Sequence, residues 1–403
     1  MNVFRMAWRN VWRNRRRSWV AIAAMTLALW VMVLYAGIVP GYLQNMESSV
    51  TQLEIGDIQV HAPGYLEGPS LYTAVEDSAA IVEQLEQAGI AASPRLLGGG
   101  LASSGESSAG VSLRGIDVER DARVSRLSEV VDQGEWLDPA DPMGVVLGKR
   151  LARTLGAGPG SELIVVSQAA DGSMANDLYR VRGVLKGVAQ GSDRSAVLMN
   201  AVSFRELMAF PTGDHQIVLR RGEGELEAVA ATARAIAPEL DVKTWKELMP
   251  AVAQMFEFAQ VAPIMMSLIV YLAVGILILN AMLTAVFERI REFGVLKAIG
   301  AGPSKILGLV LVEGAIQVAV ASVLGLVLAL PAMWYLTVHG IDAGAMGGLD
   351  AAGVAMAEIW YGIYSVEACA GPVITLWVIA LGAVLYPGLK AAWINPIRAM
   401  RHR

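Results

Sequence analysis

Cysteine is almost absent from the chain, and charged residues are scarce. The 403 residues include one cysteine, Cys369, which excludes an intrachain disulfide, a thiolate metal cluster and a CxxC redox pair. Asp, Glu, Lys and Arg make up 17% of the chain, whereas soluble proteins carry about 25%, and the mean hydropathy is +0.48. The low charge argues against a purely soluble protein, and the length predicts a membrane part and a separate globular part.

Motifs of the common catalytic and cofactor sites are also missing. The four histidines form no HExxH pair, and no GxSxG nucleophile turn occurs. Residues 144–150 (GVVLGKR) lack the glycine spacing of a phosphate-binding loop and have an arginine where that loop has Ser or Thr. We therefore expect no catalytic residue, cofactor or metal in this chain. With a net charge of −5, we also expect no nucleic-acid partner.

Four stretches are apolar over the roughly 20 residues that a membrane-spanning helix needs. The clearest includes residues 258–287, which contain no Asp, Glu, Lys or Arg. A cleaved signal peptide is the alternative for the first stretch, but residues 19–39 exceed the about 7–15 apolar residues of a signal core, so we favour an anchor. The predicted segments are a basic amphipathic helix at 1–18, spans at 19–39, 263–287, 306–332 and 371–390, a large domain at 40–262, connections at 288–305 and 333–370, and a tail at 391–403.

Lys and Arg gather on one side of the predicted spans. Residues 1–18 carry six Arg and no acid, the 288–305 connection has four Lys or Arg against two acids, and the region from Lys390 onward adds four more. Residues 40–260 instead hold 18 basic and 30 acidic residues, and 333–370 holds four acids and neither Lys nor Arg. Because short basic flanks stay in the cytoplasm, we expect both termini on the cytoplasmic side of the membrane and the large domain on the opposite side.

The large domain changes pattern several times along its length. Strand patterns occur at 55–60, 111–116, 163–166, 179–184 and 217–220, and helical patterns occur at 74–88, 149–155 and 226–236. Residues 97–110 are rich in Gly and Ser, so we expect a mobile loop there. Residues 249–261 are apolar on one face and should continue as a helix into the second span. The expected fold is an α-helical membrane protein with four spans and an α+β domain inserted between the first two.

The most informative run is residues 288–301, ERIREFGVLKAIGA, between the second and third spans. Charges alternate at its start, and Phe293, Leu296 and Ile299 then recur at helical spacing before Gly300. Such an amphipathic helix could dock in a groove of a partner protein or lie at the membrane surface. The pattern alone does not choose between these two interpretations.

This run resembles the coupling helix of the FtsX-like permeases of ABC transporters, whose usual form is E-R-x-R-E-F-G-x-L-K-A-x-G-A. Residues 10–17 resemble the basic entry to that family's first span, and residues 386–392 and 395–401 resemble its C-terminal signature, with Gly388 in place of a more usual alanine. In the large domain, residues 114–117, 134–137 and 147–152 resemble elements of a MacB-like periplasmic core domain. The chain is therefore identified as a member of the type VII, or mechanotransmission, group of permeases.

The resemblance implies that a separate ABC ATPase, holding ATP and Mg, binds the coupling helix. It also implies a dimer, either with a second copy of the permease or with a paralogue. Glu313 matches a glutamate common in the family's third span, and we expect it to have a structural or force-transmitting role, near the headgroups or paired with Lys305. The residues expected to couple to the ATPase are Glu288, Arg289, Arg291, Glu292, Phe293, Gly294, Leu296, Lys297 and Gly300.

The substrate class is less well defined by the resemblance. Residues 56–65 (GDIQVHAPGY) look most like lipoprotein-releasing permeases, so we expect lipoprotein release from the inner membrane. Efflux of drugs or peptides with a periplasmic adaptor, and FtsX-like signalling to a periplasmic partner, stay open as alternatives. A membrane sensor without transport is a further alternative, and a membrane-bound enzyme is a weaker one.

Overall fold

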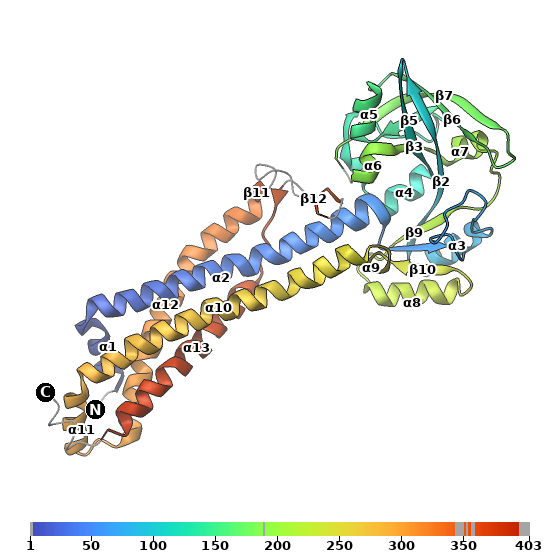
Figure 1. Ribbon diagram of the computed structural model, residues 1–403. Coiled ribbons are helices and arrows are strands. Elements are labelled where there is room, and N and C mark those ends of the chain that lie inside the picture. The colour runs from blue at the N-terminus through green and yellow to red at the C-terminus, as the bar shows by residue number, and fades with distance from the viewer. Residues whose placement is uncertain (1–2, 188–189, 343–349, 352–353, 356–358, 395–403) are drawn as a thin grey trace. The chain divides into compact units, whose positions relative to one another are not determined.

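The computed structural model describes residues 3–187, 190–342, 350–351, 354–355 and 359–394. The chain divides into two compact units, which are described separately below (Figure 1). The helical unit comprises Met1–Leu43, Glu257–Asp342 and Ile359–Arg403, and the globular unit comprises Gln44–Phe256 and Ala343–Glu358.

Four long helices in the described part of the chain are long and apolar enough to cross a membrane. They begin and end beyond the predicted spans, and α10 is continuous from Pro250, as the apolar pattern of residues 249–261 predicted. The predicted basic helix at 1–18 is divided, because α1 ends at Arg13 and α2 begins at Arg15. Residues 395–403 of the predicted tail lie outside the described residues. The helices are α1 (Val3–Arg13), α2 (Arg15–Val50), α10 (Pro250–Glu288), α11 (Ile290–Ala298), α12 (Pro303–His339) and α13 (Val366–Ala392).

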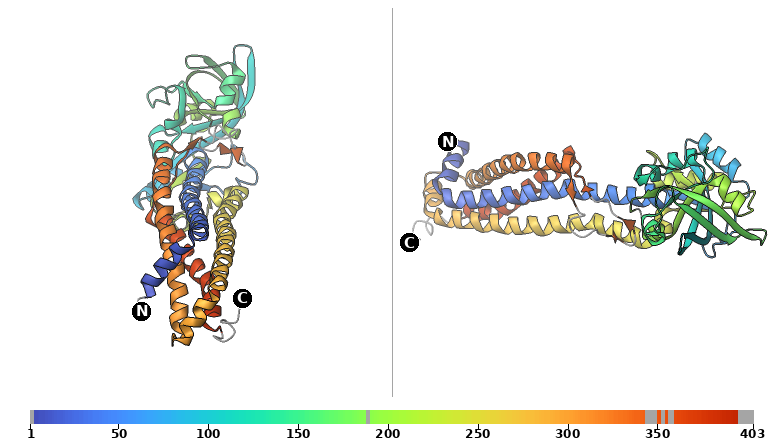
Figure 2. Two further views of the ribbon diagram at one scale, coloured as in Figure 1. Left: turned by 90° about the vertical axis from the view of Figure 1, so that its left-hand side faces the viewer. Right: turned by 90° about the horizontal axis from the view of Figure 1, so that it is seen from above.

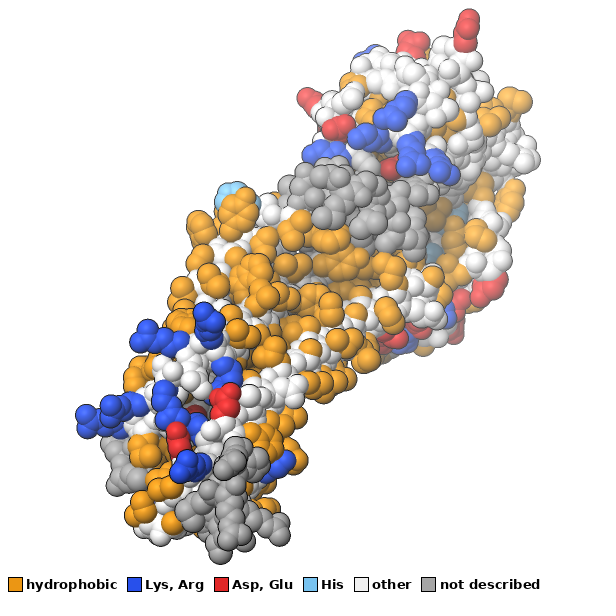
Figure 3. All heavy atoms as spheres, turned by 60° about the vertical axis from the view of Figure 1, so that its left-hand side comes forward, with side chains coloured by type: hydrophobic (Ala, Val, Ile, Leu, Met, Phe, Trp, Pro, Cys, Tyr) orange, Lys and Arg blue, Asp and Glu red, His pale blue; other side chains and the backbone are white. Residues whose placement is uncertain are grey.

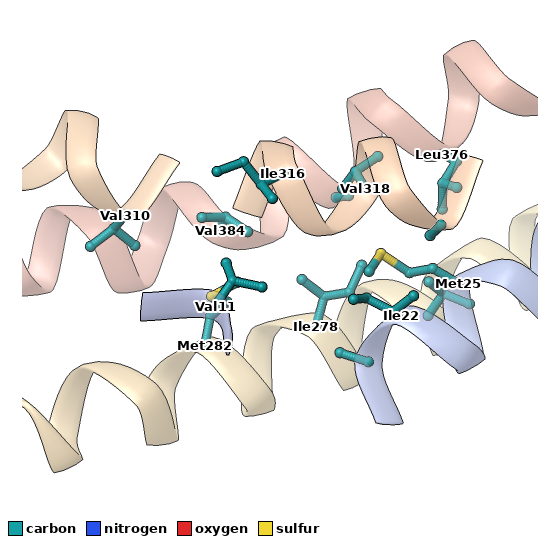
Figure 4. Packing of buried hydrophobic residues seen from close by; sticks show 14 of the residues in the cluster. Val11, Ile22, Met25, Ile278, Met282, Val310, Ile316, Val318, Leu376 and Val384 are labelled. Carbon is teal, nitrogen blue, oxygen red and sulfur yellow. The ribbon is translucent and has the colours of Figure 1, made fainter. Parts of the chain in front are cut away.

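The long helices run side by side and share one apolar core (Figure 2). Buried aliphatic and methionine side chains from α1, α2, α10, α12 and α13 meet there (Figure 4). Two glycines of α12 let neighbouring helices approach closely. A Cβ on Gly314 would lie 2.7 Å from Val384 Cγ2, and one on Gly325 would lie 2.8 Å from Leu29 Cδ2. Small residues therefore fix how α2 and α13 pack on α12.

The outside of the helical unit is also apolar. Hydrophobic side chains cover the helices, whereas Lys, Arg, Asp and Glu gather at one end, over α1 and α11 (Figure 3). Exposed large residues are frequent along α10 and include Ile264, Leu268 and Ile269. Because water would penalise so large an apolar surface, this part of the chain is suited to a lipid environment.

The globular unit is built around one ten-stranded sheet, with strand order β10-β1-β9-β2-β3-β8-β5-β7-β4 and β6 pairing with both β2 and β7. Its helices pack around the sheet, and a π-helical turn (Thr51–Ile55) precedes β1. The strands are β1 (Ile58–His61), β2 (Ala91–Ser104), β3 (Ser107–Ile116), β4 (Val131–Gly134), β5 (Gly144–Leu147), β6 (Glu162–Gln168), β7 (Met174–Leu185), β8 (Ala196–Asn200), β9 (Gln216–Arg220) and β10 (Asp241–Thr244). The helices are α3 (Ser78–Gln87), α4 (Val118–Val124), η2 (Leu127–Val130), α5 (Lys149–Leu155), α6 (Gln190–Ser195), α7 (Ala201–Leu207), α8 (Leu226–Ile236) and α9 (Trp245–Leu248). Four two-residue strands complete the described chain: β11 (Ile341–Asp342) pairs with β14 (Ile359–Trp360), and β12 (Asp350–Ala351) pairs with β13 (Val354–Ala355).

The two shorter predicted helices, at 149–155 and 226–236, are confirmed by α5 and α8. The mobile loop predicted at 97–110 is wrong, because these residues form most of the β2–β3 hairpin, paired from Arg95↔Ile116 to Ser104↔Ser107. Packing explains two of the glycines there, Gly98 and Gly100. A Cβ on Gly98 would lie 3.1 Å from Phe204 Cζ, and one on Gly100 would lie 2.8 Å from the Val166 carbonyl oxygen. Tertiary contacts therefore override the weak strand propensity of glycine.

Candidate functional site

The short helix α11 connects α10 to α12 at the charged end of the helical unit. The α-helical path breaks at Arg289, whose φ of −109° and ψ of 16° lie outside the helical region, and α11 then runs from Ile290 to Ala298. The connection turns at Gly300, whose φ of +98° is a conformation that favours glycine. The predicted amphipathic helix is therefore present as a separate element between two long helices.

A buried ion pair joins this break to α12. Arg289 Nη1 donates to both oxygens of Glu313, at 2.8 and 3.0 Å, and each side chain is only 8% exposed. Asn10 Nδ2 of α1 donates to Glu313 Oε1 at 2.6 Å. Three segments that are far apart in the sequence therefore meet at one carboxylate. The ion-pair partner of Glu313 is Arg289, across the helix break, and not Lys305 as the sequence suggested.

A more exposed set of contacts surrounds this pair. Arg289 Nε also donates to Glu292 at 2.9 Å, and Arg13 Nη2 donates to the same carboxylate at 2.7 Å. Arg17 and Asn14 donate to Glu288, at 2.7 and 3.2 Å. Burial favours the neutral form of Glu292, but the hydrogen bonds from the two arginines hold its pKa below the usual value. These contacts attach α1 and the start of α2 to the end of α10 and to α11.

The sequence pattern placed Phe293, Leu296 and Ile299 on one face, but the structure separates them. Phe293 is buried, and the guanidinium carbon of Arg289 lies 5.2 Å from the centre of the Phe293 ring. Leu296 is half-buried and packs against the helical core. Ile299, directly after α11, is 80% exposed. Lys297 Nζ donates to the Ile394 carbonyl oxygen at 2.9 Å, next to α13.

The exposed surface of α11 consists of a different set of residues. Arg291, Val295 (43% exposed) and Ala298 face outward together with Ile299 and Gly300. Of the predicted coupling residues, Phe293 and Gly294 are buried, and Arg291 and Gly300 are exposed toward solvent. Glu288 pairs with the start of α2, Arg289 with α12 and Glu292 with α1. The residues that attach α11 to the other helices are therefore different from the residues that it exposes to solvent.

Sequence reasoning missed the polar partners on α1 and at the start of α2. Asn10 and Asn14, and likewise Arg13 and Arg17, are four residues apart, a spacing that would place each pair on one side of a continuous helix. In the structure each pair spans the break between α1 and α2. That spacing was the available signal, but the arginines were interpreted as a basic amphipathic helix and as the basic flank of the first span. Among the described residues, no group of three His, Cys, Asp or Glu side chains is placed to hold a metal ion.

Several known proteins are similar to parts of this chain. An uncharacterized ABC transporter permease of Methanocaldococcus jannaschii is 24% identical over 280 residues, covering 67% of this chain and 65% of that protein. The macrolide export ATP-binding/permease protein MacB of Nitrobacter winogradskyi is 33% identical over 126 residues, covering 31% of this chain and 17% of that protein. The chain thus spans less than two thirds of the length of either relative.

Solved structures are similar to about half of the chain. The periplasmic region of MacB from Actinobacillus actinomycetemcomitans covers 49% of this chain and 91% of that structure, at 12% identity and a TM-score of 0.36. A second match is the extracellular domain of the noncanonical ABC-type transporter YknZ from Gram-positive bacteria. It covers 46% of this chain and 98% of that structure, at 13% identity and a TM-score of 0.34.

Two family models together cover most of the chain. The MacB-like periplasmic core domain matches residues 18–236, which is more than half of the chain, and the FtsX-like permease C-terminal region matches residues 264–396. The second match includes α11 and the buried pair that anchors it. The chain belongs to the family of membrane permeases that combine a MacB-like periplasmic core domain with an FtsX-like C-terminal region.

Proposed function

We propose that the chain is the permease subunit of an ABC transporter and that α11 is the seat of a separate ATPase, which holds the ATP and Mg. The arrangement of α11 carries this proposal. Its Val295 and Ile299 side chains are apolar and exposed at the charged end of the unit, beside Arg291. A short helix that is anchored on one side and apolar on the other suits docking in a groove of a partner.

The buried contacts give a route by which movement of α11 would reach the rest of the molecule. The Arg289–Glu313 pair links α11 to α12, and the Glu292–Arg13 pair links it to α1. From Arg15, α2 continues for 36 residues, about 54 Å at about 1.5 Å per residue, to Val50 in the globular unit. Backbone hydrogen bonds resist bending and compression along the helix except at Pro40, which lacks an N–H donor, so displacement would be transmitted most directly from Arg15 to the turn before Pro40.

This function requires α11 in the cytoplasm and the globular unit in the periplasm of a bacterial inner membrane, with both termini inside. The excess of Lys and Arg at the α1 and α11 end supports that orientation. Labelling tests it directly. In a Cys369→Ser background, Arg291→Cys should react with a membrane-impermeant maleimide only after the membrane is opened, whereas Val202→Cys should react from the periplasm. Labelling of Arg291→Cys in sealed spheroplasts would contradict the orientation.

We expect the complex to contain two permeases, either two copies or a copy and a paralogue, and to release lipoproteins from the membrane. The resemblance of residues 56–65 to lipoprotein-releasing permeases supports this substrate class. MacB-like efflux with a periplasmic adaptor is the alternative that the relative from Nitrobacter winogradskyi favours, because that protein is named for macrolide export. Signalling to a periplasmic partner without transport is a further outcome of the experiment below.

The experiment replaces the exposed apolar side chain of Val295 in α11 and that of Ile299 directly after it, giving Val295→Asp and Ile299→Asp. Each variant should lose the ABC ATPase that co-purifies with the wild-type chain, and ATP hydrolysis should no longer drive substrate release in proteoliposomes. Val202→Asp is the matched control, because Val202 is 56% exposed on α7 of the globular unit. Association and transport equal to wild type in both α11 variants would refute the docking site. Coupled hydrolysis without release of lipoprotein or drug would favour signalling.

A further inference from the structure

The globular unit contains a cavity of about 610 Å³ at the place where β2 changes partners. Residues 91–95 of β2 pair with β9, whereas residues 101–103 pair with β6. The cavity lies between these two pairings and is lined by Leu97, Gly98 and Gly99 of β2 and by side chains from β1, β3, β6, β9 and the segment after β1. Its volume falls in the range of about 300–1,000 Å³ that is typical of small-ligand sites.

Gln216 of β9 presents an amide to this cavity. The residue is only 6% exposed, and its side chain makes no hydrogen bond to any residue that the structure describes. The neighbouring Gln59 is different, because its Nε2 donates to the Ile55 carbonyl oxygen at 2.6 Å and its Oε1 lies 2.9 Å from His61 Nε2. The unpaired side-chain atoms that are fully buried in the described chain do not include the Gln216 amide, so the amide is open to the cavity and suited to pair with a molecule that enters it.

Gly99 leaves the backbone of β2 open at the wall of the cavity. Packing requires the glycines on either side of it, as described above, but a Cβ on Gly99 would meet only the Val111 carbonyl oxygen, at 3.8 Å. Glycine in the interior of a strand lowers stability unless another backbone or a ligand approaches it closely. Gly99 lines the cavity and is exposed, so a ligand can approach its backbone closely without displacing a side chain.

The chemistry of the lining selects the ligand class. Ser70, Ser112, Gln168 and Gln216 offer neutral donors and acceptors, and no carboxylate is among the described lining residues, whose one charged side chain is Arg114. The apolar part of the wall consists of Leu66, Leu71, Leu97 and Met208. Tyr65 stacks on His61 with ring centres 5.2 Å apart, so this ring face is not available to stack on a sugar. A chain of alternating amides with small side chains fits this wall.

His215 holds two walls of the cavity in place. The Leu97 backbone N–H donates to His215 Nδ1 at 3.0 Å, which makes Nε2 the protonated nitrogen, and Nε2 donates to the Leu71 carbonyl oxygen at 3.0 Å. The segment after β1 is thereby fixed to β2. A site that is already formed loses less conformational entropy when its ligand binds.

We propose that this cavity binds a short, extended peptide segment whose main chain lies against Gly99 and pairs with the Gln216 amide. Peptide groups offer a donor and an acceptor together, which matches both ends of a glutamine side chain. The ligand's side chains lie against the leucine and methionine wall. Binding at this site needs neither ATP nor a partner subunit, so it is independent of the function proposed for α11.

The test uses the full chain in detergent, without ATPase, and a pool of acetylated, amidated pentapeptides of random sequence. Peptides that co-elute with the protein are identified by mass spectrometry, and the most enriched one is titrated. Gln216→Leu removes the amide at similar volume, and Gly99→Val blocks close approach of a main chain. Gly110→Val is the matched control, because Gly110 is an exposed strand glycine on β3 that lies outside the cavity, and a Cβ added to it would have no atom within 4 Å.

We expect wild type and Gly110→Val to bind the same peptide, and Gln216→Leu and Gly99→Val each to bind it at least about tenfold more weakly. Gln216→Leu should melt at or above the wild-type temperature, since it breaks no hydrogen bond to the described residues. A lower melting temperature would show that Gln216 has a structural role and would overturn the proposal. Absence of any enriched peptide, or equal affinity in all four proteins, would overturn it as well.

Discussion

Changing Glu313 to glutamine removes the negative charge from the buried contact between α11 and α12 while keeping the shape of the side chain. Breaking a buried ion pair by removing one partner costs about 3–5 kcal/mol, because the remaining charge stays buried. Arg289 keeps its hydrogen bond to Glu292 at 2.9 Å, which offsets part of that cost. We therefore expect a loss near the lower limit, about 3 kcal/mol, or about a hundredfold in the unfolding equilibrium.

The assay is a denaturant titration of the detergent-solubilised chain, followed by the fluorescence of its tryptophans. Glu292→Gln is the control, because this side chain is 46% exposed and its ion pairs should contribute at most about 1 kcal/mol. Replacing the pair by Glu313→Leu with Arg289→Met should recover most of the loss, since an apolar pair of similar volume needs no compensating charge. If Glu313→Gln cost no more than Glu292→Gln, the buried pair would not be the anchor of α11.

Three further predictions concern the two units separately. Burial lowers the pKa of both His61 and His215, so the folded chain binds fewer protons than the unfolded chain below about pH 6.5. The melting temperature of the globular unit should therefore be highest above pH 6.5 and fall toward pH 5, and the fall should be smaller when both histidines are changed to glutamine. Gly325→Val should destabilise the helical unit by about 1–3 kcal/mol in a denaturant titration through overlap with Leu29, and a simultaneous Leu29→Ala should return part of that loss. Thr244→Ala removes the capping box at the start of α9 and should cost about 1 kcal/mol in the same titration, whereas Thr244→Ser should cost much less.

Local pattern predicted those elements whose residues carry their own signal. The helix at 226–236 has apolar spacing and ends before Pro238, and α8 covers those residues. The coupling run is contiguous in sequence, so its helix and the turn at Gly300 could also be predicted. The face that the helix exposes could not, because Phe293 is buried by an arginine and by helices from distant parts of the chain.

The contacts that anchor the site depend on tertiary structure. Glu313 looked like an isolated acid within an apolar span, and nothing nearby in the sequence identifies Arg289 or Asn10 as its partners. The β2–β3 hairpin was missed for a related reason. Its glycines have weak strand propensity, and only Phe204 and Val166, which are distant in sequence, explain why side chains are excluded there.

The bond between Asn10 and Glu313 also sets an order of events during synthesis. The two residues are 303 positions apart, so at about 5–20 residues per second the ribosome needs roughly 15–60 s to make the second after the first. During that interval the nascent amino-terminal helix has no carboxylate to receive the Asn10 amide. Final docking of this helix must therefore wait until the third span has been inserted, which makes completion of the bundle a late step in biogenesis.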